Sequence, residues 1–412
     1  MSIVVTKCSP VIVGPSELGT STGNIHLSSF DKAMDTGPVS LLLVFNKPID
    51  DPVETVKRAL SRALVHYYPI SGRLAAGADG GDKVISCTGE GQGVLFVGAS
   101  ASCGIDDMPG LLSDLVVHYP DRLCRQADPL LVMQVTEFSC GGFAVGVTWD
   151  HVLADAAGMG QFLQAVGEMA RGFSLPSVVP VRSDELVMAA RPQGMTAADF
   201  LSAETTSDQN MAMLDFTIPY SLISRIKSEV SLALGKRCTT FEAAVAILWQ
   251  CRARAVASDD GDGPATTTTL VFTSNARHLV GAAEGYYGNC SIDESAQATS
   301  AQVASGDTKD VVKLIKSVKH KVQEQINKGG GEVDRAPLKL GYNTIYLSSW
   351  RNLGLEMADF GGGRPARVMG LVPFCVLCPP WNVNDDGVNV MGSIVKKNHV
   401  NAFLHELAAL TL

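Results

Sequence analysis

The segment FAVGVTWDHVLADAAGMGQFLQAVGEMA, residues 143–170, joins an apolar strand to an amphipathic helix and places a histidine at the junction. Every second residue from Phe143 to Trp149 is apolar, so one face of the predicted strand should lie in a core, with His151 next on that face. A histidine at such a junction is held by rigid structure on one side and can face open space on the other, which suits a proton carrier. Taken alone, these residues favour a core or strand-end histidine with no catalytic role, and the catalytic interpretation needs further signals.

The composition is that of a soluble globular protein with a large core. The chain has 412 residues, of which 46% are hydrophobic and 18% charged. It exceeds the ~250–300 residues at which a single core usually stops growing, so we expect two domains. A formal net charge of −9 argues against a nucleic-acid partner. No run of 18 apolar residues and no export signal is visible, so we expect a cytoplasmic protein without a membrane span.

Ten cysteines are scattered along the chain, mostly in apolar surroundings. In a chain without an export signal they are expected to be reduced thiols of the core. Cys375 and Cys378 form a C-x-x-C pair, but no second pair and no histidine pair accompany them. We therefore predict apolar strand residues there and no metal site.

Helical and strand periodicities alternate along most of the chain. The pattern predicts helices within residues 51–70, 161–172, 239–257, 310–326 and 398–412. It predicts strands within residues 2–13, 40–45, 83–87, 93–98, 130–138, 142–150, 267–277, 344–350, 366–380 and 387–395. Each half of the chain thus mixes strands with helices, which favours an α/β or α+β two-domain enzyme with a cleft between the halves.

The periodicity lapses between the two halves, and a stretch of ~40 residues without it is uncommon inside a compact domain. We therefore predict an N-terminal domain over residues 1–175, an interdomain linker over 176–215 and a C-terminal domain over 216–412.

Several catalytic signatures are absent from the sequence. There is no G-x-S-x-G nucleophile elbow, no H-E-x-x-H, and no glycine-rich phosphate loop after a strand. What remains is a histidine that deprotonates an external nucleophile. Asp155 lies four residues beyond His151 and can either polarise it or point back into the structure, where a buried carboxylate needs a partner such as an arginine.

A second constellation is YLSSWRNLGLEMADFGGGRPARV, residues 346–368. Its Asp359-Phe360-Gly361-Gly362-Gly363 run predicts a tight turn. The glycines allow positive φ, and the aspartate side chain can accept hydrogen bonds from the loop.

The two motifs together resemble those of the BAHD family of plant acyl-CoA-dependent acyltransferases. These are His151-x-x-x-Asp155 in mid-chain and, about 200 residues later, the Asp-Phe-Gly-x-Gly-x-Pro turn from Asp359 to Pro365. Supporting segments follow in the family's order: LSSFDK (27–32), ALVHYYPISGRL (63–74), DPLLVMQVTEF (128–138), TTFEAAVAILWQCRARA (239–255), GYYGNC (285–290) and LSSWRNLGL (347–355). The similarity runs essentially from end to end.

The chain departs from the family pattern at two places. Ala156 stands where the family usually has glycine, and Gly362 stands where it usually has tryptophan. Because the turn is a structural element in the family, we expect looser packing around Gly362 but no loss of activity.

The resemblance implies two similar-sized domains of mixed sheets and helices, with a channel between them. It also implies that acyl-CoA is a cosubstrate, with no metal and no tightly bound cofactor. His151 would act as general base on an acceptor hydroxyl or amine, which attacks the thioester directly without an acyl-enzyme. Such a base contributes about 10²–10⁴ in rate.

The resemblance also suggests roles for other residues. Ser348 and the indole N–H of Trp350 would donate to the oxyanion, although Trp350 can equally be a packing residue. Asp155 would form a structural ion pair with Arg277, and Asp359, Gly361 and Gly363 would shape the turn. Lys236 and Arg237, just before a predicted helix start, would attract CoA phosphates, although a solvated surface pair is an equal alternative.

The GYYGNC, LSSFDK and glycine-only turn segments resemble those of grass enzymes grouped with benzyl-alcohol-type and hydroxycinnamoyl transferases. They suggest an aromatic donor, benzoyl- or hydroxycinnamoyl-CoA, an alcohol acceptor and a monomeric enzyme. The alternatives are an amine acceptor, hydrolysis of acyl-CoA, or a binding protein that keeps the fold without turnover.

Overall fold

A computed structural model of the chain describes residues 3–17, 22–77, 81–89, 91–189, 210–256, 266–327, 341–380 and 387–411. The chain forms two compact units, each assembled from separate stretches of sequence. Unit 1 comprises Met1–Pro192, Val280–Cys290 and Trp350–Leu371, and unit 2 comprises Gln193–Leu279, Ser291–Ser349 and Val372–Leu412. Two segments from the second half of the sequence therefore belong to unit 1.

The predicted linker over residues 176–215 is described only in part. Residues 190–209 lie outside the described residues. Before them, Val181 forms a parallel bridge to Tyr286, and the short helix α4 spans Glu185–Ala189. The predicted domain limits at 175 and 216 stay predictions.

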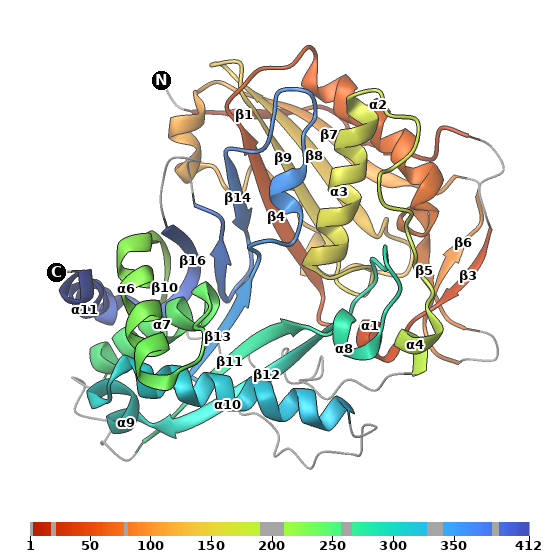
Figure 1. Ribbon diagram of the computed structural model, residues 1–412. Coiled ribbons are helices and arrows are strands. Elements are labelled where there is room, and N and C mark those ends of the chain that lie inside the picture. Colours follow the sequence, from red (N-terminus) through yellow and green to blue (C-terminus); the bar gives the residue numbers. More distant parts are fainter. Residues whose placement is uncertain are drawn as a thin grey trace. The chain divides into compact units, whose positions relative to one another are not determined.

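Within its described residues, unit 1 contains a seven-stranded sheet in the order β1-β7-β8-β9-β4-β14, with β2 also paired to β7 (Figure 1). The bounds are Val5–Lys7 (β1), Val11–Val13 (β2), Pro38–Phe45 (β4), Val94–Ala101 (β7), Leu131–Phe138 (β8), Phe143–Asp150 (β9) and Arg367–Gly370 (β14). The strand predictions within 40–45, 93–98, 130–138 and 142–150 are confirmed. Strand β9 is buried at every residue because β8 and β4 flank it and both of its faces are covered.

Helices α2 (Pro52–His66) and α3 (Ala156–Ala170) lie side by side, and α2 packs on β7 and β8 (Figure 1). Helix α2 begins where the sequence predicts, because the Asp51 side chain accepts the Glu54 N–H and Pro52 occupies the first turn. The predicted helix over 161–172 begins five residues earlier, at Ala156, where Asp155 caps it.

Three glycines let backbone from later in the chain pack directly on α3. A Cβ at Gly158 would lie 1.8 Å from the Tyr287 carbonyl oxygen. A Cβ at Gly160 would lie 2.3 Å from the Leu353 carbonyl oxygen, and one at Gly167 would lie 2.6 Å from the Asp359 carbonyl oxygen. No side chain fits at such distances, so these glycines are required for the segments 280–290 and 350–371 to complete unit 1.

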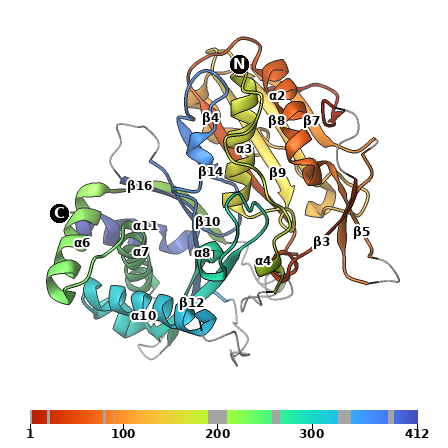
Figure 2. The same cartoon turned by 45° about the vertical axis from the view of Figure 1, so that its right-hand side comes forward.

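Strand β14 comes from the second of these segments and extends the unit 1 sheet. It pairs antiparallel with β4 from Arg367 opposite Val44 to Gly370 opposite Leu41 (Figure 2). A three-stranded sheet, β3-β6-β5, also belongs to unit 1 within its described residues. Its strands span Gly23–His26 (β3), Arg73–Ala75 (β5) and Val84–Cys87 (β6). Other short helices among the described residues of the unit span Ser29–Ala33 (α1), Tyr68–Ser71 (η1), Ile105–Gly110 (η3), Pro120–Arg122 (η4) and Leu355–Met357 (η5).

Unit 2 contains a six-stranded sheet among its described residues, in the order β10-β16-β15-β13-β11-β12. Its strands span Met211–Pro219 (β10), Thr267–Asn275 (β11), Ser291–Thr299 (β12), Thr344–Ser349 (β13), Cys375–Cys378 (β15) and Gly387–Lys396 (β16). Its helices span Tyr220–Leu234 (α6), Thr240–Val256 (α7), Arg277–Val280 (α8, whose last residue belongs to unit 1), Ser300–Ser305 (α9), Thr308–Asn327 (α10), Lys397–His399 (η6) and Val400–Thr411 (α11). The helix predictions within 239–257, 310–326 and 398–412 are confirmed.

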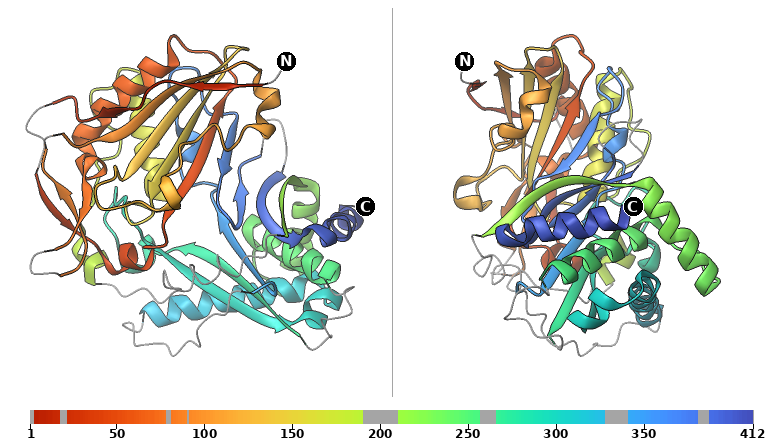
Figure 3. Two further views of the ribbon diagram at one scale, coloured as in Figure 1. Left: turned by 180° about the vertical axis from the view of Figure 1, so that it is seen from behind. Right: turned by 90° about the vertical axis from the view of Figure 1, so that its left-hand side faces the viewer.

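Helix α7 is central to unit 2 and is buried over nearly its whole length. It packs against α6, α9, α10 and α11 and against the sheet (Figure 2). Helix α11 runs along β10, where the rings of Phe403 and Phe216 meet edge to face with centroids 5.7 Å apart (Figure 3). Because α7 has neighbours on all sides, its apolar residues are spread around the helix and do not form one stripe.

The C-x-x-C pair is part of strand β15, and both of its cysteines are buried there. Residues three apart on a strand point to opposite faces, so Cys375 and Cys378 do not converge on one point. In the part of the chain that the structure describes, no helix is long and apolar enough to cross a membrane.

Candidate active site

The turn after β9 is fixed by local hydrogen bonds. The His151 N–H donates to the Gly37 carbonyl oxygen at 3.4 Å, and the Val152 N–H donates to Asp150 Oδ1 at 3.0 Å. The Trp149 indole N–H reaches across the turn to the Ala154 carbonyl oxygen at 2.8 Å. Burial raises the pKa of the Asp150 carboxyl, and the Val152 N–H opposes that shift. His151 itself is half-buried. The three hydrogen bonds fix the backbone of the turn on which it lies.

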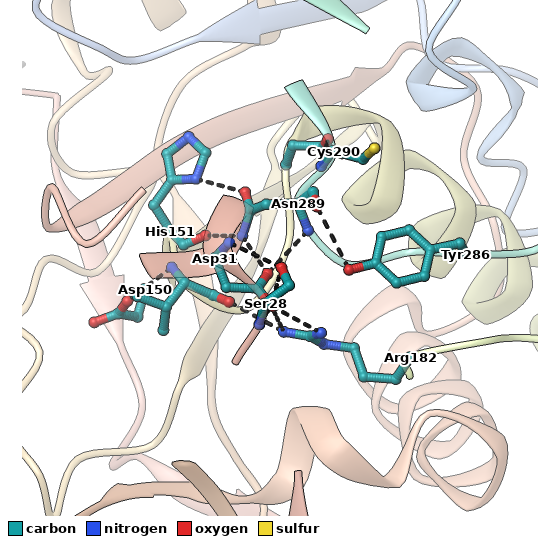
Figure 4. Close-up of polar contacts among 10 residues, drawn as sticks. Ser28, Asp31, Asp150, His151, Arg182, Tyr286, Asn289 and Cys290 are labelled. Atoms are coloured by element: carbon teal, nitrogen blue, oxygen red, sulfur yellow. Dashed lines mark hydrogen bonds and ion pairs between the residues drawn. The ribbon is translucent and has the colours of Figure 1, made fainter. Parts of the chain in front are cut away.

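The His151 side chain contacts Asn289, which belongs to the GYYGNC segment of unit 1. His151 Nδ1 lies 3.1 Å from Asn289 Oδ1, and the Asn289 amide nitrogen donates to the His151 carbonyl oxygen at 2.8 Å. Figure 4 shows the two side chains pointing toward each other. Asn289 is fully buried, so its amide is a rigid partner for the imidazole.

Asp31 holds Asn289 from the other side. Its Oδ1 accepts both the backbone N–H of Asn289 at 3.1 Å and the side-chain amide at 3.0 Å. Its Oδ2 accepts the backbone N–H and the hydroxyl of Ser28, each at 2.9 Å, in a capping box at the start of α1. A carboxylate with no exposed surface is thereby surrounded by donors.

Arg182 pairs with Asp31 in the interior of unit 1 (Figure 4). Arg182 Nη2 lies 3.1 Å from Asp31 Oδ2 and also donates to the Val152 carbonyl oxygen at 3.2 Å. Burial by itself would lower the pKa of Arg182, but the Asp31 carboxylate and two nearby tyrosines outweigh it and leave the pKa above its usual value. The ion pair therefore ties Asp31 to the residue after His151.

Asp155 acts as a structural link at the start of α3. Its Oδ1 accepts the Gly158 N–H and its Oδ2 accepts the Cys290 N–H, both at 3.0 Å. Asp155 thus caps α3 and holds the residue next to Asn289. Arg277 belongs to unit 2, and its ion pair with Asp155 stays a prediction.

The other predicted residues lie in different surroundings. Trp350 is buried at the start of the 350–371 segment, and Ser348 is half-buried in β13. Lys236 and Arg237 are exposed in the loop between α6 and α7. Their proposed roles toward the oxyanion and the CoA phosphates stay predictions.

Asp359 closes the turn of the second motif. Its Oδ1 accepts the N–H groups of Gly361 at 2.8 Å and Gly363 at 2.9 Å, and its Oδ2 lies 3.1 Å from Arg171 Nη1. Burial alone would raise the pKa of Asp359, but these donors outweigh it and leave the pKa below its usual value. Gly361 and Gly363 have φ of +118° and +103°, as a glycine turn requires, whereas the φ of Gly362 is not positive.

Replacing Gly363 with alanine is expected to lower the free energy of unfolding by about 1–3 kcal/mol, because a side chain is strained at this positive φ. The matched change Gly362→Ala meets ordinary φ and a Cβ contact of 3.0 Å with Ile49 Cγ2. The Cβ would also lie 3.2 Å from the Lys47 carbonyl oxygen, so both neighbours must move by a few tenths of an ångström. Because no positive φ has to be strained, we expect this change to cost less than Gly363→Ala, about 1 kcal/mol. Urea unfolding of both variants measures the difference, and equal losses would contradict the backbone argument.

Sequence reasoning missed three residues of this site. Asn289 and Asp31 lie in GYYGNC and LSSFDK, which support the family resemblance but gave no role to either residue. Arg182 lies in the stretch predicted to be a linker. All three are ionisable or amide residues that stand among apolar and turn residues. If buried, each would need a hydrogen-bond partner, and this requirement is what could have indicated them.

The chain is similar to known proteins over almost its whole length. The profile of a family described as Transferase family matches residues 3–407. Acyl transferase 15 of Oryza sativa subsp. japonica is 42% identical over 439 residues, covering 100% of this chain and 99% of the relative. A myricetin 3-O-glucosyl 1,2-rhamnoside 6'-O-caffeoyltransferase, AT1, of Crocosmia x crocosmiiflora is 34% identical, covering 90% of this chain and 89% of the relative.

Among solved structures, vinorine synthase has a similar fold, with a TM-score of 0.74 and 19% identity over 99% of this chain and 98% of that chain. The two-domain α/β architecture expected from the sequence is therefore confirmed. With the family profile matching almost the whole chain and whole-length plant acyltransferases as relatives, this protein belongs to the BAHD family of acyl-CoA-dependent acyltransferases.

Proposed function

We propose that the protein transfers an aromatic acyl group, of the benzoyl or hydroxycinnamoyl kind, from coenzyme A to the hydroxyl group of a small alcohol. The observation that carries this proposal is the placement of His151 on a rigid turn, with Nδ1 3.1 Å from the buried Asn289. An aromatic donor is supported by the caffeoyltransferase among the relatives.

In this reaction His151 takes the proton from the acceptor hydroxyl while the oxygen attacks the thioester carbonyl. A tetrahedral intermediate forms directly, without an acyl-enzyme. When it collapses, the C–S bond breaks and the imidazolium gives its proton to the departing CoA sulfur. A positioned base of this kind contributes about 10²–10⁴ in rate.

Ser348 and Trp350 are proposed to donate hydrogen bonds to the oxyanion, where each such donor typically contributes about 10²–10³ in rate. Lys236 and Arg237 are proposed to attract the CoA phosphates. Their exposure leaves both side chains available to a charged ligand. Asp155 is proposed to contribute indirectly, by fixing the start of α3 and the backbone at Cys290.

Thiol release from a panel of acyl-CoAs, crossed with alcohols, with amines and with no acceptor, tests the function. We expect release that depends on an alcohol acceptor and is fastest with aromatic acyl groups. Release without an acceptor would identify a hydrolase, and amine-dependent release would identify an N-acyltransferase. No release with any pair would contradict an enzymatic role and favour a binding protein.

A further inference from the structure

The role of Asn289 described here rests on the function proposed above. The hydrogen-bond pattern around this residue determines which way its amide faces. Both hydrogens of the side-chain NH₂ have acceptors, Asp31 Oδ1 at 3.0 Å and the His151 carbonyl oxygen at 2.8 Å. The opposite orientation would place the amide oxygen against a carboxylate oxygen and a carbonyl oxygen, neither of which can donate.

The amide orientation in turn assigns the proton on His151. With NH₂ facing Asp31, the remaining amide atom is Oδ1, which can only accept a hydrogen bond. It lies 3.1 Å from His151 Nδ1, so Nδ1 must carry a proton to make this contact. In a neutral imidazole a proton on Nδ1 leaves Nε2 with a free lone pair.

We propose that Asn289 is a positioning residue whose side-chain oxygen keeps the proton of neutral His151 on Nδ1, so that Nε2 is the basic nitrogen in acyl transfer. Nε2 takes the proton of the attacking hydroxyl and later returns it to the CoA sulfur, while Nδ1 stays protonated throughout. The Asn289 oxygen also stabilises the imidazolium that exists between these steps.

Asp31 sets the direction of this chain of hydrogen bonds. It accepts from the backbone and the side chain of Asn289, and Arg182 and Ser28 donate to its other oxygen. Because Asp31 offers only acceptor oxygens toward Asn289, the asparagine cannot turn without losing two hydrogen bonds. A continuous chain of hydrogen bonds thus links the Arg182–Asp31 ion pair through Asn289 to the imidazole of His151.

The first test is nitrogen NMR of the wild-type protein labelled with ¹⁵N-histidine. His151→Gln identifies the signals of His151 among the eight histidines. At a pH where the ring is neutral we expect a protonated Nδ1 and an unprotonated Nε2. A proton on Nε2 would overturn the proposal, and this readout does not depend on activity.

The second test is the kinetics of Asn289→Ala. We expect kcat to fall about tenfold to a hundredfold, less than the ~10²–10⁴ lost with the base itself, because part of the histidine population still has the correct tautomer. KM for acyl-CoA should change little, since Asn289 acts through His151. The NMR preference for a protonated Nδ1 should disappear in the same variant.

Asn389→Ala is the matched control. Asn389 is also a buried asparagine, but it lies in β16 of unit 2 and its amide donates to Asp215 Oδ1 at 3.0 Å. It should lower stability while keeping kcat and the His151 tautomer. If Asn289→Ala behaves like this control, the positioning role is wrong. If Asn289→Ala does not fold, the wild-type NMR experiment decides alone.

The two proposals fail in different ways. An active wild-type enzyme whose kcat survives Asn289→Ala refutes the positioning role and leaves the proposed function intact. An inactive wild-type protein with a protonated Nδ1 refutes the proposed function while the tautomer assignment still holds.

Discussion

Replacing His151 with alanine is expected to lower the turnover of acyl transfer at least ~10²-fold, because the reaction loses its positioned base. The variant should still fold, because the His151 backbone keeps its hydrogen bond to Gly37 and the ring contributes only its contact to Asn289 Oδ1. It should also bind coenzyme A with near-normal affinity, because proton transfer and not anchoring is the proposed role of the ring. Steady-state kinetics and calorimetric titration with CoA measure the two effects.

His118→Ala is the control for this experiment, since His118 is an exposed histidine of the same unit. It should retain wild-type turnover. A His151→Ala protein that is well folded and keeps most of its activity would refute the general-base mechanism.

Replacing Asp31 with alanine is expected to lower the free energy of unfolding by about 3–5 kcal/mol, because it leaves the Arg182 charge buried without its partner. The side chains of Asp31 and Arg182 are only 0% and 5% exposed. The same change removes an acceptor from Ser28 and Asn289. Urea unfolding followed by circular dichroism measures the loss.

Asp35→Ala is the matched control, because Asp35 pairs with Lys83 where both side chains are exposed, 38% and 55%. This surface pair should contribute less than about 1 kcal/mol. The double change Asp31→Leu with Arg182→Met removes both charges and should be more stable than Asp31→Ala. Equal losses for Asp31→Ala and Asp35→Ala would contradict the importance of burial.

The strand–turn–helix unit around His151 could be predicted because its signals are local. The two-residue period of β9 lies within the segment itself, whereas the start of α3 is predicted five residues too late because Asp155 is not identified as its cap. Strand β12 was missed because Asp293 and Glu294 disfavour a strand, yet both are buried there. Asp293 is accommodated by hydrogen bonds from Thr273 and Tyr346, which the sequence of β12 does not reveal.

The partner of His151 could not be predicted for a related reason. Asn289 is separated from His151 by 138 residues, and only the packing of 280–290 on α3 brings the two together. The requirement for glycine at position 158 is visible only once the Tyr287 backbone lies against it. Long-range contacts of this kind leave no periodic pattern in the sequence.

Because unit 1 is assembled from three separate stretches of sequence, its parts are synthesised at different times. Residues 1–192 emerge first, but Asn289 and strand β14 follow only after much of unit 2 has been synthesised. Until then the nascent chain carries β4 as an unpaired sheet edge, and such edges favour association with other chains. His151 can meet Asn289 only after residues 193–279 of unit 2 have been made, and the sheet gains its last strand later still, when Arg367–Gly370 emerges.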